Sequence, residues 1–157
     1  PYVMNLMTRI QHRLGSWLRG QLILSLIIFT LTYIGLSILG VKYALVLALM
    51  AGLFEVVPYI GPIMAAIPAI FLAFQQSNVL ALFVLGLYFI VQQLENIIIV
   101  PRVMGKITGL NPVVVLLAVL IGAKLAGVVG ALMAVPVTTA LSVFLEDFSR
   151  SERSQND

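Results

Sequence analysis

Glu55 is the residue whose type and position point most directly to chemistry. It lies inside an apolar run, three residues before the helix-breaking cluster Pro58-Tyr59-Ile60-Gly61-Pro62. Between Val41 and Phe74 the only other charged residue is Lys42, at the edge of the run. An acid in hydrocarbon is costly, so it requires a partner, a proton or a water-filled cavity. A broken helix that carries an ionisable group is typical of the ion and substrate sites of membrane transporters.

A second polar group lies near the end of another apolar run, Val79–Val100. Gln92, Glu95 and Asn96 are three and four residues apart there, so they share one face of a helix. That face could line a cavity. Alternatively, it could lie at the level of the lipid headgroups, because Arg102 follows closely.

The composition is that of an integral membrane protein. Of 157 residues, 61% are hydrophobic and 10% are charged. The net charge of +3 comes from basic residues at the ends of the apolar segments, so we expect no nucleic-acid partner. Without cysteine, and with one histidine, the sequence offers no disulfide framework and no transition-metal centre. It contains no phosphate-binding loop and no Ser/His/Asp set, so we predict neither an enzyme nor a cofactor.

Hydropathy predicts the elements that must position these residues. Residues 1–20 read as an amphipathic helix at the membrane surface, or else as the tail of a soluble domain. Two uncharged runs, Leu22–Leu39 and Val79–Val100 up to its polar end, have the length of a membrane span. Two blocks, Tyr43–Phe74 and Pro112–Phe144, are too long for one span and too short for two comfortable ones.

Both long blocks contain a break, and the second is broken near Gly127–Gly130. The arms Tyr43–Val57 and Ile63–Phe74 of the first block reach only about 20 Å each, whereas the hydrocarbon core is about 30 Å thick. We therefore expect re-entrant hairpins, with two tightly packed crossings as the alternative. Within the first block, Gly61, Ala65, Ala69 and Ala73 recur every four residues and predict a closely packed helix face.

The charge pattern supports this topology. If both blocks return to the side they entered, most basic residues share one face, which the positive-inside rule makes cytoplasmic. These residues are Arg9, Arg13, Arg19, Arg102, Lys106, Arg150 and Arg153. Both ends of the segment are then cytoplasmic.

The sequence also suggests an internal repeat. A shift of 69 residues places Gly40 on Gly109 and Glu55 on Lys124. Each unit then has one crossing helix and one broken block. An odd number of crossings per unit makes the second unit inverted relative to the first. The alternative is that these matches arise by chance in a sequence rich in Gly, Ala and Leu. Glu55 and Lys124 could form a structural ion pair, or Lys124 could be a counter-charge that is released when a cation reaches Glu55.

Seven segments together carry a resemblance to a known family: Trp17–Gln21, Leu39–Ala44, Glu55–Pro62, Gln92–Asn96, Val100–Lys106, Gly109–Pro112 and Gly130–Pro136. They resemble the autoinducer-2 exporter (AI-2E) family of bacterial membrane transporters. The resemblance covers nearly the whole chain, and the elements Pro-Tyr-Ile-Gly-Pro and Pro-Arg-Val-Met-Gly, in this order, are specific. Members of the family are longer, so the chain looks like a C-terminal half.

The resemblance implies export of a small molecule, or cation exchange, across the bacterial inner membrane. It places functional residues in the first break and on the later helix: Glu55, Pro58, Gly61, Pro62, Gln92, Glu95 and Asn96. To these the repeat adds Lys124. A transient Na⁺ at Glu55 or Glu95 is the one metal ion that we expect.

We therefore predict an all-α polytopic membrane protein of two inverted units, each a spanning helix with a broken or re-entrant hairpin. An interfacial helix (1–20) precedes a transport domain (21–146, with repeats 21–76 and 77–146) and a cytoplasmic polar tail (147–157). The predicted function is alternating-access transport of an autoinducer-2-like molecule or a cation, coupled to a proton or Na⁺ gradient. The expected partners are the lipid bilayer, the substrate and further copies of the chain. The alternatives are a structural or partner-binding membrane protein, or a passive channel.

Overall fold

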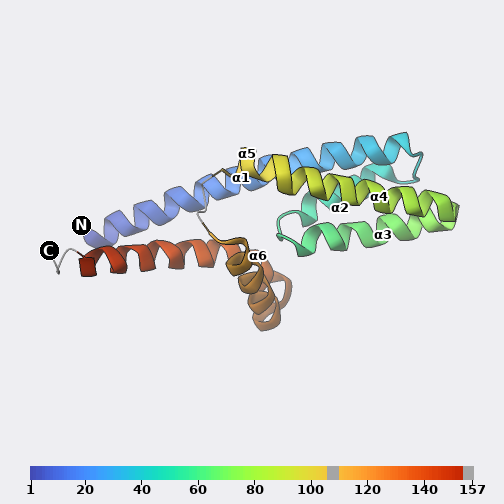
Figure 1. Ribbon diagram of the computed structural model, residues 1–157. Coiled ribbons are helices and arrows are strands. Elements are labelled where there is room, and N and C mark those ends of the chain that lie inside the picture. The colour runs from blue at the N-terminus through green and yellow to red at the C-terminus, as the bar shows by residue number, and fades with distance from the viewer. Residues whose placement is uncertain (106–109, 154–157) are drawn as a thin grey trace. The chain divides into compact units, whose positions relative to one another are not determined.

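The computed structural model describes residues 1–105 and 110–153, and this part of the chain is helical with no strand. The predicted all-α class is therefore confirmed. Figure 1 shows the elements in order. They are α1 (Tyr2–Ile38), α2 (Ala44–Phe54), α3 (Ile60–Gln76), α4 (Asn78–Leu94), the π-helical segment η1 (Glu95–Ile99), α5 (Val100–Val103) and α6 (Pro112–Arg153).

Three of the described helical stretches are long and apolar enough to cross a membrane. They are Tyr2–Ile38, Asn78–Val103 and Pro112–Ser149, while α2 and α3 are shorter apolar helices. Large apolar side chains cover much of the surface; Leu53 is 70% exposed and Leu125 is 81% exposed. Such a surface is stable in lipid and not in water, so the protein is a multi-pass integral membrane protein.

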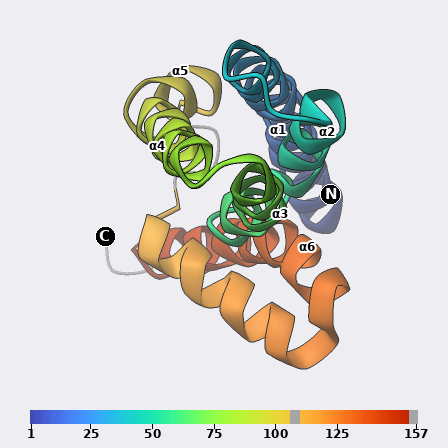
Figure 2. The same cartoon turned by 90° about the vertical axis from the view of Figure 1, so that its right-hand side faces the viewer.

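The chain folds into two compact units. One comprises Gly20–Gly105, and the other combines Pro1–Arg19 with the chain from Lys106 onward. Within Gly20–Gly105, the second part of α1 packs with α2, α3 and α4, which Figure 2 shows nearly end-on. The core contains Leu36, Val41, Leu47, Ala69, Ala73, Ala81 and Val84.

Small residues let these helices approach closely. The predicted row Gly61, Ala65, Ala69 and Ala73 is the buried face of α3, which confirms that prediction. A Cβ on Gly52 of α2 would lie 2.9 Å from the carbonyl oxygen of Ser25 in α1. Lipid tails are as apolar as the helix side chains, so no hydrophobic effect drives helices together in a membrane. Close packing of helix backbones is therefore a main source of helix association.

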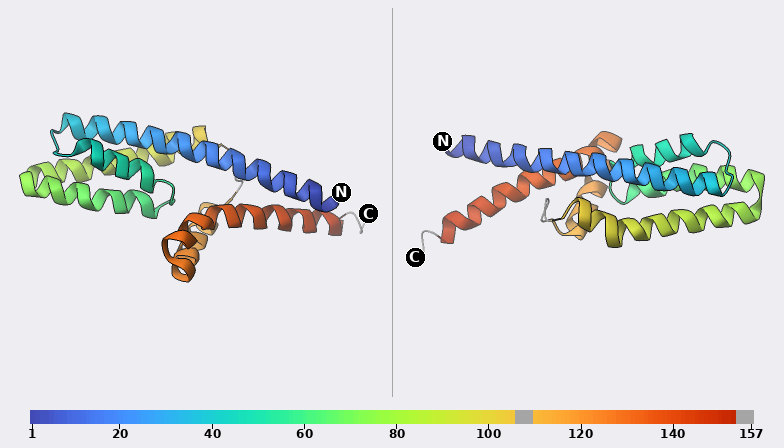
Figure 3. Two further views of the ribbon diagram at one scale, coloured as in Figure 1. Left: turned by 180° about the vertical axis from the view of Figure 1, so that it is seen from behind. Right: turned by 90° about the horizontal axis from the view of Figure 1, so that it is seen from above.

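The break between α2 and α3 lies close to where the sequence predicts it, and Figure 3 shows the turn that it forms. Helix α2 ends at Phe54, three residues before the predicted end of the first arm, and α3 begins at Ile60. Tyr59 precedes α3 with a φ of 65°. With 11 and 17 residues, the two helices are about 16 Å and 26 Å long, each less than the hydrocarbon core. A re-entrant path agrees with these lengths and stays a prediction.

The helix that carries Gln92 and Glu95 is not regular to its end. The helical stretch continues from Asn78 to Val103, but Glu95–Ile99 form a π-helical turn inside it. Hydropathy does not distinguish a π turn from an α turn, so the sequence did not predict it. Such turns are rare and occur frequently at functional sites.

The other unit contains the second predicted break. Helix α6 is kinked at Ala126 and Gly127, where Gly127 has a φ of 59°. The backbones of Gly122 and Gly130 touch, so that a Cβ on Gly130 would overlap the Gly122 carbonyl oxygen. The break near Gly127–Gly130 is therefore confirmed, whereas the inverted relation of the two repeats stays a prediction.

Helices extend across both ends of the predicted transport domain, whose boundaries stay a prediction. The segment 1–20, predicted as an interfacial helix, lies within α1 from Tyr2 onward, and α6 extends to Arg153 in the predicted tail. Near these ends, ion pairs join Arg9 to Asp147 (2.8 Å) and Arg13 to Glu146 (3.0 Å). Lys106 and Gly109, and the side chains of Arg150 and Arg153, lie outside the described residues.

We expect Gly61→Ala to destabilise the protein by roughly 1–3 kcal/mol, because a methyl group there overlaps the Phe54 carbonyl oxygen and forces the backbone to shift. Gly86→Ala is the matched control, since nothing lies within 4 Å of a Cβ at that position. Thermal unfolding of the full-length protein in detergent measures both. Equal melting temperatures for the two variants would contradict the close approach.

Candidate functional site

Two carboxyl groups meet inside the Gly20–Gly105 unit. Glu55 follows the last residue of α2, and Glu95 opens the π-helical turn η1. Both side chains are buried, with exposures of 2% and 6%, and both line the same small cavity. Two ionised carboxylates that lie close together in apolar surroundings repel each other, so such a pair favours a shared proton or a bound cation.

A small, partly open cavity of about 20 Å³ lies at this pair. Helices α1, α2, α3 and α4 contribute to its wall together with the break and η1. The lining residues are Ile28, Thr32, Ala51, Glu55, Pro62, Ala65, Tyr88, Val91, Gln92 and Glu95. No lysine, arginine or histidine is among them, so the acidic pair has no basic neighbour within the cavity wall.

Two polar atoms of this wall lack a hydrogen-bond partner within the part of the chain that the structure describes. They are Oε2 of Glu55 and the hydroxyl of Tyr88. Leaving a buried polar group unsatisfied costs about 1–3 kcal/mol, and more when it is charged. Because buried polar groups in proteins are nearly always paired, a small polar occupant of the cavity could satisfy both atoms.

The predicted polar face of α4 and η1 is present. The Gln92 amide donates hydrogen bonds of 3.4 Å to Glu95 Oε2 and to Asn96 Oδ1. Gln92 and Glu95 line the cavity, whereas Asn96 is exposed and does not. For Gln92 and Glu95, the cavity-lining alternative therefore agrees with the structure.

The backbone of the break is held from α1. Gln21 is 3% exposed, and its Nε2 donates a hydrogen bond of 2.6 Å to the carbonyl oxygen of Glu55. This carbonyl has lost its helical partner because α2 ends beside it. Gln21 thus satisfies a buried acceptor and fixes the position of the acid.

Sequence reasoning missed three of these polar groups: Gln21, Thr32 and Tyr88. A signal existed for α1, since Gln21, Ser25 and Thr32 recur at intervals of four and seven along one face of an apolar helix. Polar side chains in a spanning helix face the protein interior almost always. For Tyr88 no comparable signal exists, because a single tyrosine in an apolar run is also common in lipid-facing positions.

The remaining predicted residues have varied positions. Pro62 lines the cavity and Gly61 is the point of close approach, whereas Pro58 lies in the break without lining the cavity. Lys124 is exposed and belongs to the other unit. Its pairing with Glu55 stays a prediction.

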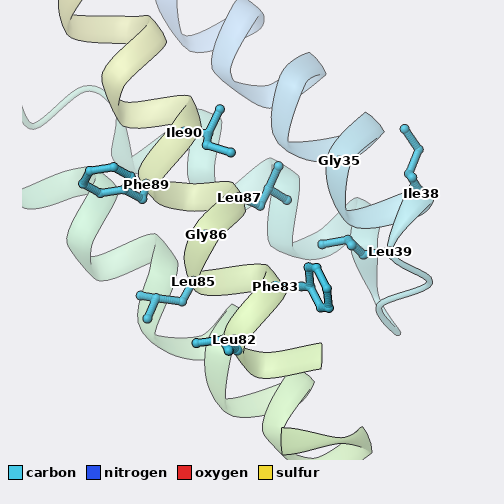
Figure 4. Close-up of a pocket in the computed structure, with 10 residues that line it drawn as sticks. All are labelled: Gly35, Ile38, Leu39, Leu82, Phe83, Leu85, Gly86, Leu87, Phe89 and Ile90. Carbon is cyan, nitrogen blue, oxygen red and sulfur yellow. The ribbon is translucent and has the colours of Figure 1, made fainter. Parts of the chain in front are cut away.

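A larger hollow on the same unit has a different character. It is a groove of about 870 Å³ between the end of α1 and α4. Figure 4 shows its lining, which includes Gly35, Leu39, Phe83 and Gly86 and contains only apolar residues. Its lining side chains offer no ligand atoms for an ion.

The fold and the site together define a polytopic α-helical membrane protein with a buried acidic pair beside a broken helix. Residues 3–150 match the sequence profile of the AI-2E family transporters, and the chain belongs to this family. The resemblance seen in the sequence is thereby confirmed.

Curated relatives agree with the family. YrrI of Bacillus subtilis is 39% identical over 137 residues, which are 87% of this chain and 39% of YrrI. YhhT of Escherichia coli K12 is 33% identical over 133 residues, which are 84% of this chain and 38% of YhhT. Both are named as candidate transport proteins. The chain spans about two fifths of the length of these relatives.

We expect Gln21→Leu to lower the free energy of unfolding by about 1–3 kcal/mol, because the Glu55 carbonyl loses its buried donor. The control is Gln93→Leu, an exposed position on α4 of the same unit. Titration of the full-length protein with a denaturing detergent, followed by circular dichroism, gives the two values. A loss no greater than that of Gln93→Leu would show that the hydrogen bond does not hold the break.

Proposed function

We propose that the full-length protein is a membrane transporter that works by alternating access and is coupled to a proton or cation at the Glu55–Glu95 pair. The observation that carries this proposal is the contact of two buried carboxyl groups beside a helix break. Intramembrane acids are rare and expensive, and they mark ion pathways in membrane proteins. Broken helices at such acids are the usual way in which transporters build ion sites.

The coupling follows from burial. The pair holds a proton or a cation while the cavity is closed, and it can exchange that occupant only when the surrounding helices open a path to water. A change of occupant therefore accompanies a change of conformation. The short helices α2 and α3, joined by a turn and packed through small residues, are the elements best suited to such a movement.

The transported molecule needs a separate site. A cavity of about 20 Å³ holds one water-sized species, so an autoinducer-2-like molecule does not fit beside the two acids. We propose that the acid pair is the coupling site and that the exported molecule binds elsewhere in the full-length protein. The family and the names of the relatives support transport as such.

The proposed setting is the bacterial inner membrane, with both ends of this segment in the cytoplasm, two inverted repeats and several copies of the chain assembled together. Arg9 and Arg13 at one end of the segment and Arg102 after the second predicted span support the orientation through the positive-inside rule.

We expect Glu55→Gln and Glu95→Gln to lower flux driven by a pH gradient at least tenfold, because glutamine keeps the volume of each side chain and cannot exchange a proton. The full-length protein in liposomes is assayed with ²²Na⁺ and with autoinducer-2 as probes. Glu146→Gln is the control, an exposed acid in a surface ion pair. Unchanged flux in both buried variants would refute the coupling role. Flux through the unmodified protein that does not depend on the pH gradient would indicate a passive channel.

Cysteine labelling tests the orientation, since this segment has no cysteine of its own. In a full-length protein without other cysteines, we expect Arg102→Cys to react only from the cytoplasm and Ser77→Cys only from the opposite side. Tyr59→Cys, in the break, separates the two paths of the α2–α3 block. If the α2–α3 block is re-entrant, the cysteine at position 59 does not react with cytoplasmic reagents. If the block crosses the membrane twice, that cysteine lies at the cytoplasmic side and reacts with them.

A further inference from the structure

We infer that Met104, seated on Gly20 of α1, is a gate that closes the path from the cavity at Glu55 to the cytoplasmic face of the membrane. This inference rests on the proposed alternating-access function and goes beyond it, because it assigns the place at which the path opens. Two sequence motifs without a role in the acid pair meet at this contact. Gly20 belongs to the motif Trp17–Gln21. Met104 belongs to the motif Val100–Lys106.

Met104 fills the space that Gly20 leaves free. A Cβ on Gly20 would lie 2.7 Å from Sδ of Met104, so a side chain at position 20 would push the methionine aside. Met104 is 9% exposed although it follows the last residue of α5, and Figure 1 shows α5 beside α1. The next residue of α1, Gln21, donates its hydrogen bond to the Glu55 carbonyl oxygen. The contact therefore lies directly beside the break.

The contact lies at one end of the cavity. In α1 the lining residues Ile28 and Thr32 come eight and twelve residues after Gly20, and eight residues are about 12 Å along a helix axis. In the stretch from α4 to α5, Glu95 is the last lining residue and Met104 comes nine residues later. Figure 1 shows that the two stretches run in opposite directions. Both chains therefore pass from the cavity to the contact at the same end.

Charged residues beside the contact indicate which membrane face it serves. Arg19 precedes Gly20, and Arg102 lies two residues before Met104; both arginines are exposed. A basic residue thus flanks the contact on each helical stretch. By the positive-inside rule this end faces the cytoplasm, so Met104 lies between the cavity and the cytoplasm.

The opposite end of the cavity is built differently. There α1 and α4 meet at Gly35 and Leu87, where a Cβ on the glycine would overlap the leucine side chain. Figure 4 shows these two residues on their helices. Leu36, next to Gly35, belongs to the hydrophobic core of the unit, and Leu87 packs against that core. A contact that is backed by the core resists separation, so this end stays closed while the other end opens.

The end that carries Met104 has the means to move. Methionine is unbranched and has three rotatable bonds, so it can leave the space at Gly20 without a distortion of α1. The π-helical turn Glu95–Ile99 precedes it, and Pro101 has no backbone N–H to donate. The backbone that leads to Met104 is therefore not held by a continuous ladder of α-helical hydrogen bonds.

Double-cysteine variants test the gate in full-length protein without other cysteines, reconstituted in liposomes. In Gly20→Cys/Met104→Cys, a short bifunctional thiol reagent joins α1 to the end of α5. We expect ²²Na⁺ flux driven by a pH gradient to fall at least about fivefold on crosslinking and to recover when a reductant cleaves the link, because a tethered gate cannot open. Mass spectrometry measures the crosslinked fraction.

The matched control for crosslinking is Gly35→Cys/Leu87→Cys, which joins α1 to α4 at the other end of the cavity. This end stays closed in the proposed movement, so we expect its flux to change by less than about twofold on crosslinking. Each variant is measured before the reagent is added, after crosslinking and after reduction. The comparison therefore separates a gate from packing that is merely structural.

Accessibility of the cavity tests the same gate without transport. Thr32→Cys places a reporter in the cavity wall, and a small water-soluble thiol reagent is added to the cytoplasmic face of inside-out vesicles. We expect Met104→Ala to raise the reaction rate of the reporter about tenfold, because alanine no longer fills the space at Gly20. Leu87→Ala is the control and should leave the rate unchanged. Size-exclusion profiles and melting temperatures establish that each variant is folded.

Two results would overturn the inference. One is a crosslinked Gly20→Cys/Met104→Cys protein that carries as much flux as the crosslinked control. The other is a reporter rate in Met104→Ala no different from that in Leu87→Ala.

These failures are separate from failure of the proposed function. If Glu55→Gln abolishes gradient-driven flux but the crosslink at the gate does not, the gate is wrong and the coupling role stands. If the crosslink stops flux but Glu55→Gln does not, the coupling role is wrong and the gate stands.

Discussion

The contact between the Glu55 and Glu95 carboxyl groups is the interaction on which the rest of the Gly20–Gly105 unit depends. Two acids buried side by side in apolar surroundings are unfavourable unless a proton, a cation or water lies between them. The surrounding structure leaves room for one such occupant: residues from four helices line the cavity at the pair, and its volume is about 20 Å³. Burial in a small cavity makes the acid pair costly. For the same reason, a small movement of the surrounding helices would change which occupant the pair can hold.

Irregular backbone places both acids. Glu55 follows the end of α2, where its carbonyl oxygen accepts from Gln21, and Glu95 begins the π-helical turn. A regular helix satisfies its own backbone and leaves no polar group free within a membrane. At the break, Gly61 lets α3 pass the end of α2 at a distance that no other residue tolerates. Two of the four buried polar atoms that lack a partner among the described residues, Glu55 Oε2 and the Tyr88 hydroxyl, belong to the cavity beside this irregular backbone.

The unit separates two kinds of hollow. The acid pair lies in a cavity of about 20 Å³ with polar groups, while the groove between α1 and α4 is about 870 Å³ and wholly apolar (Figure 4). A coupling ion and an organic solute have opposite requirements, because one needs oxygen ligands in a tight space and the other needs volume.

The sequence by itself determined the class of protein, the spans, the two breaks and most of the polar residues. Hydropathy and helix-breaking residues act locally, and the Glu55 break and the Gly127 kink both appear where Pro and Gly predict them. Only the tertiary structure decided which residue faces Glu55. The repeat in the sequence suggested Lys124, a pairing that stays a prediction. Packing within Gly20–Gly105 brings Glu95 and Tyr88 to the cavity at Glu55. Contacts between helices depend on rotation about each axis, and hydropathy shows neither that rotation nor the π-helical turn that begins at Glu95.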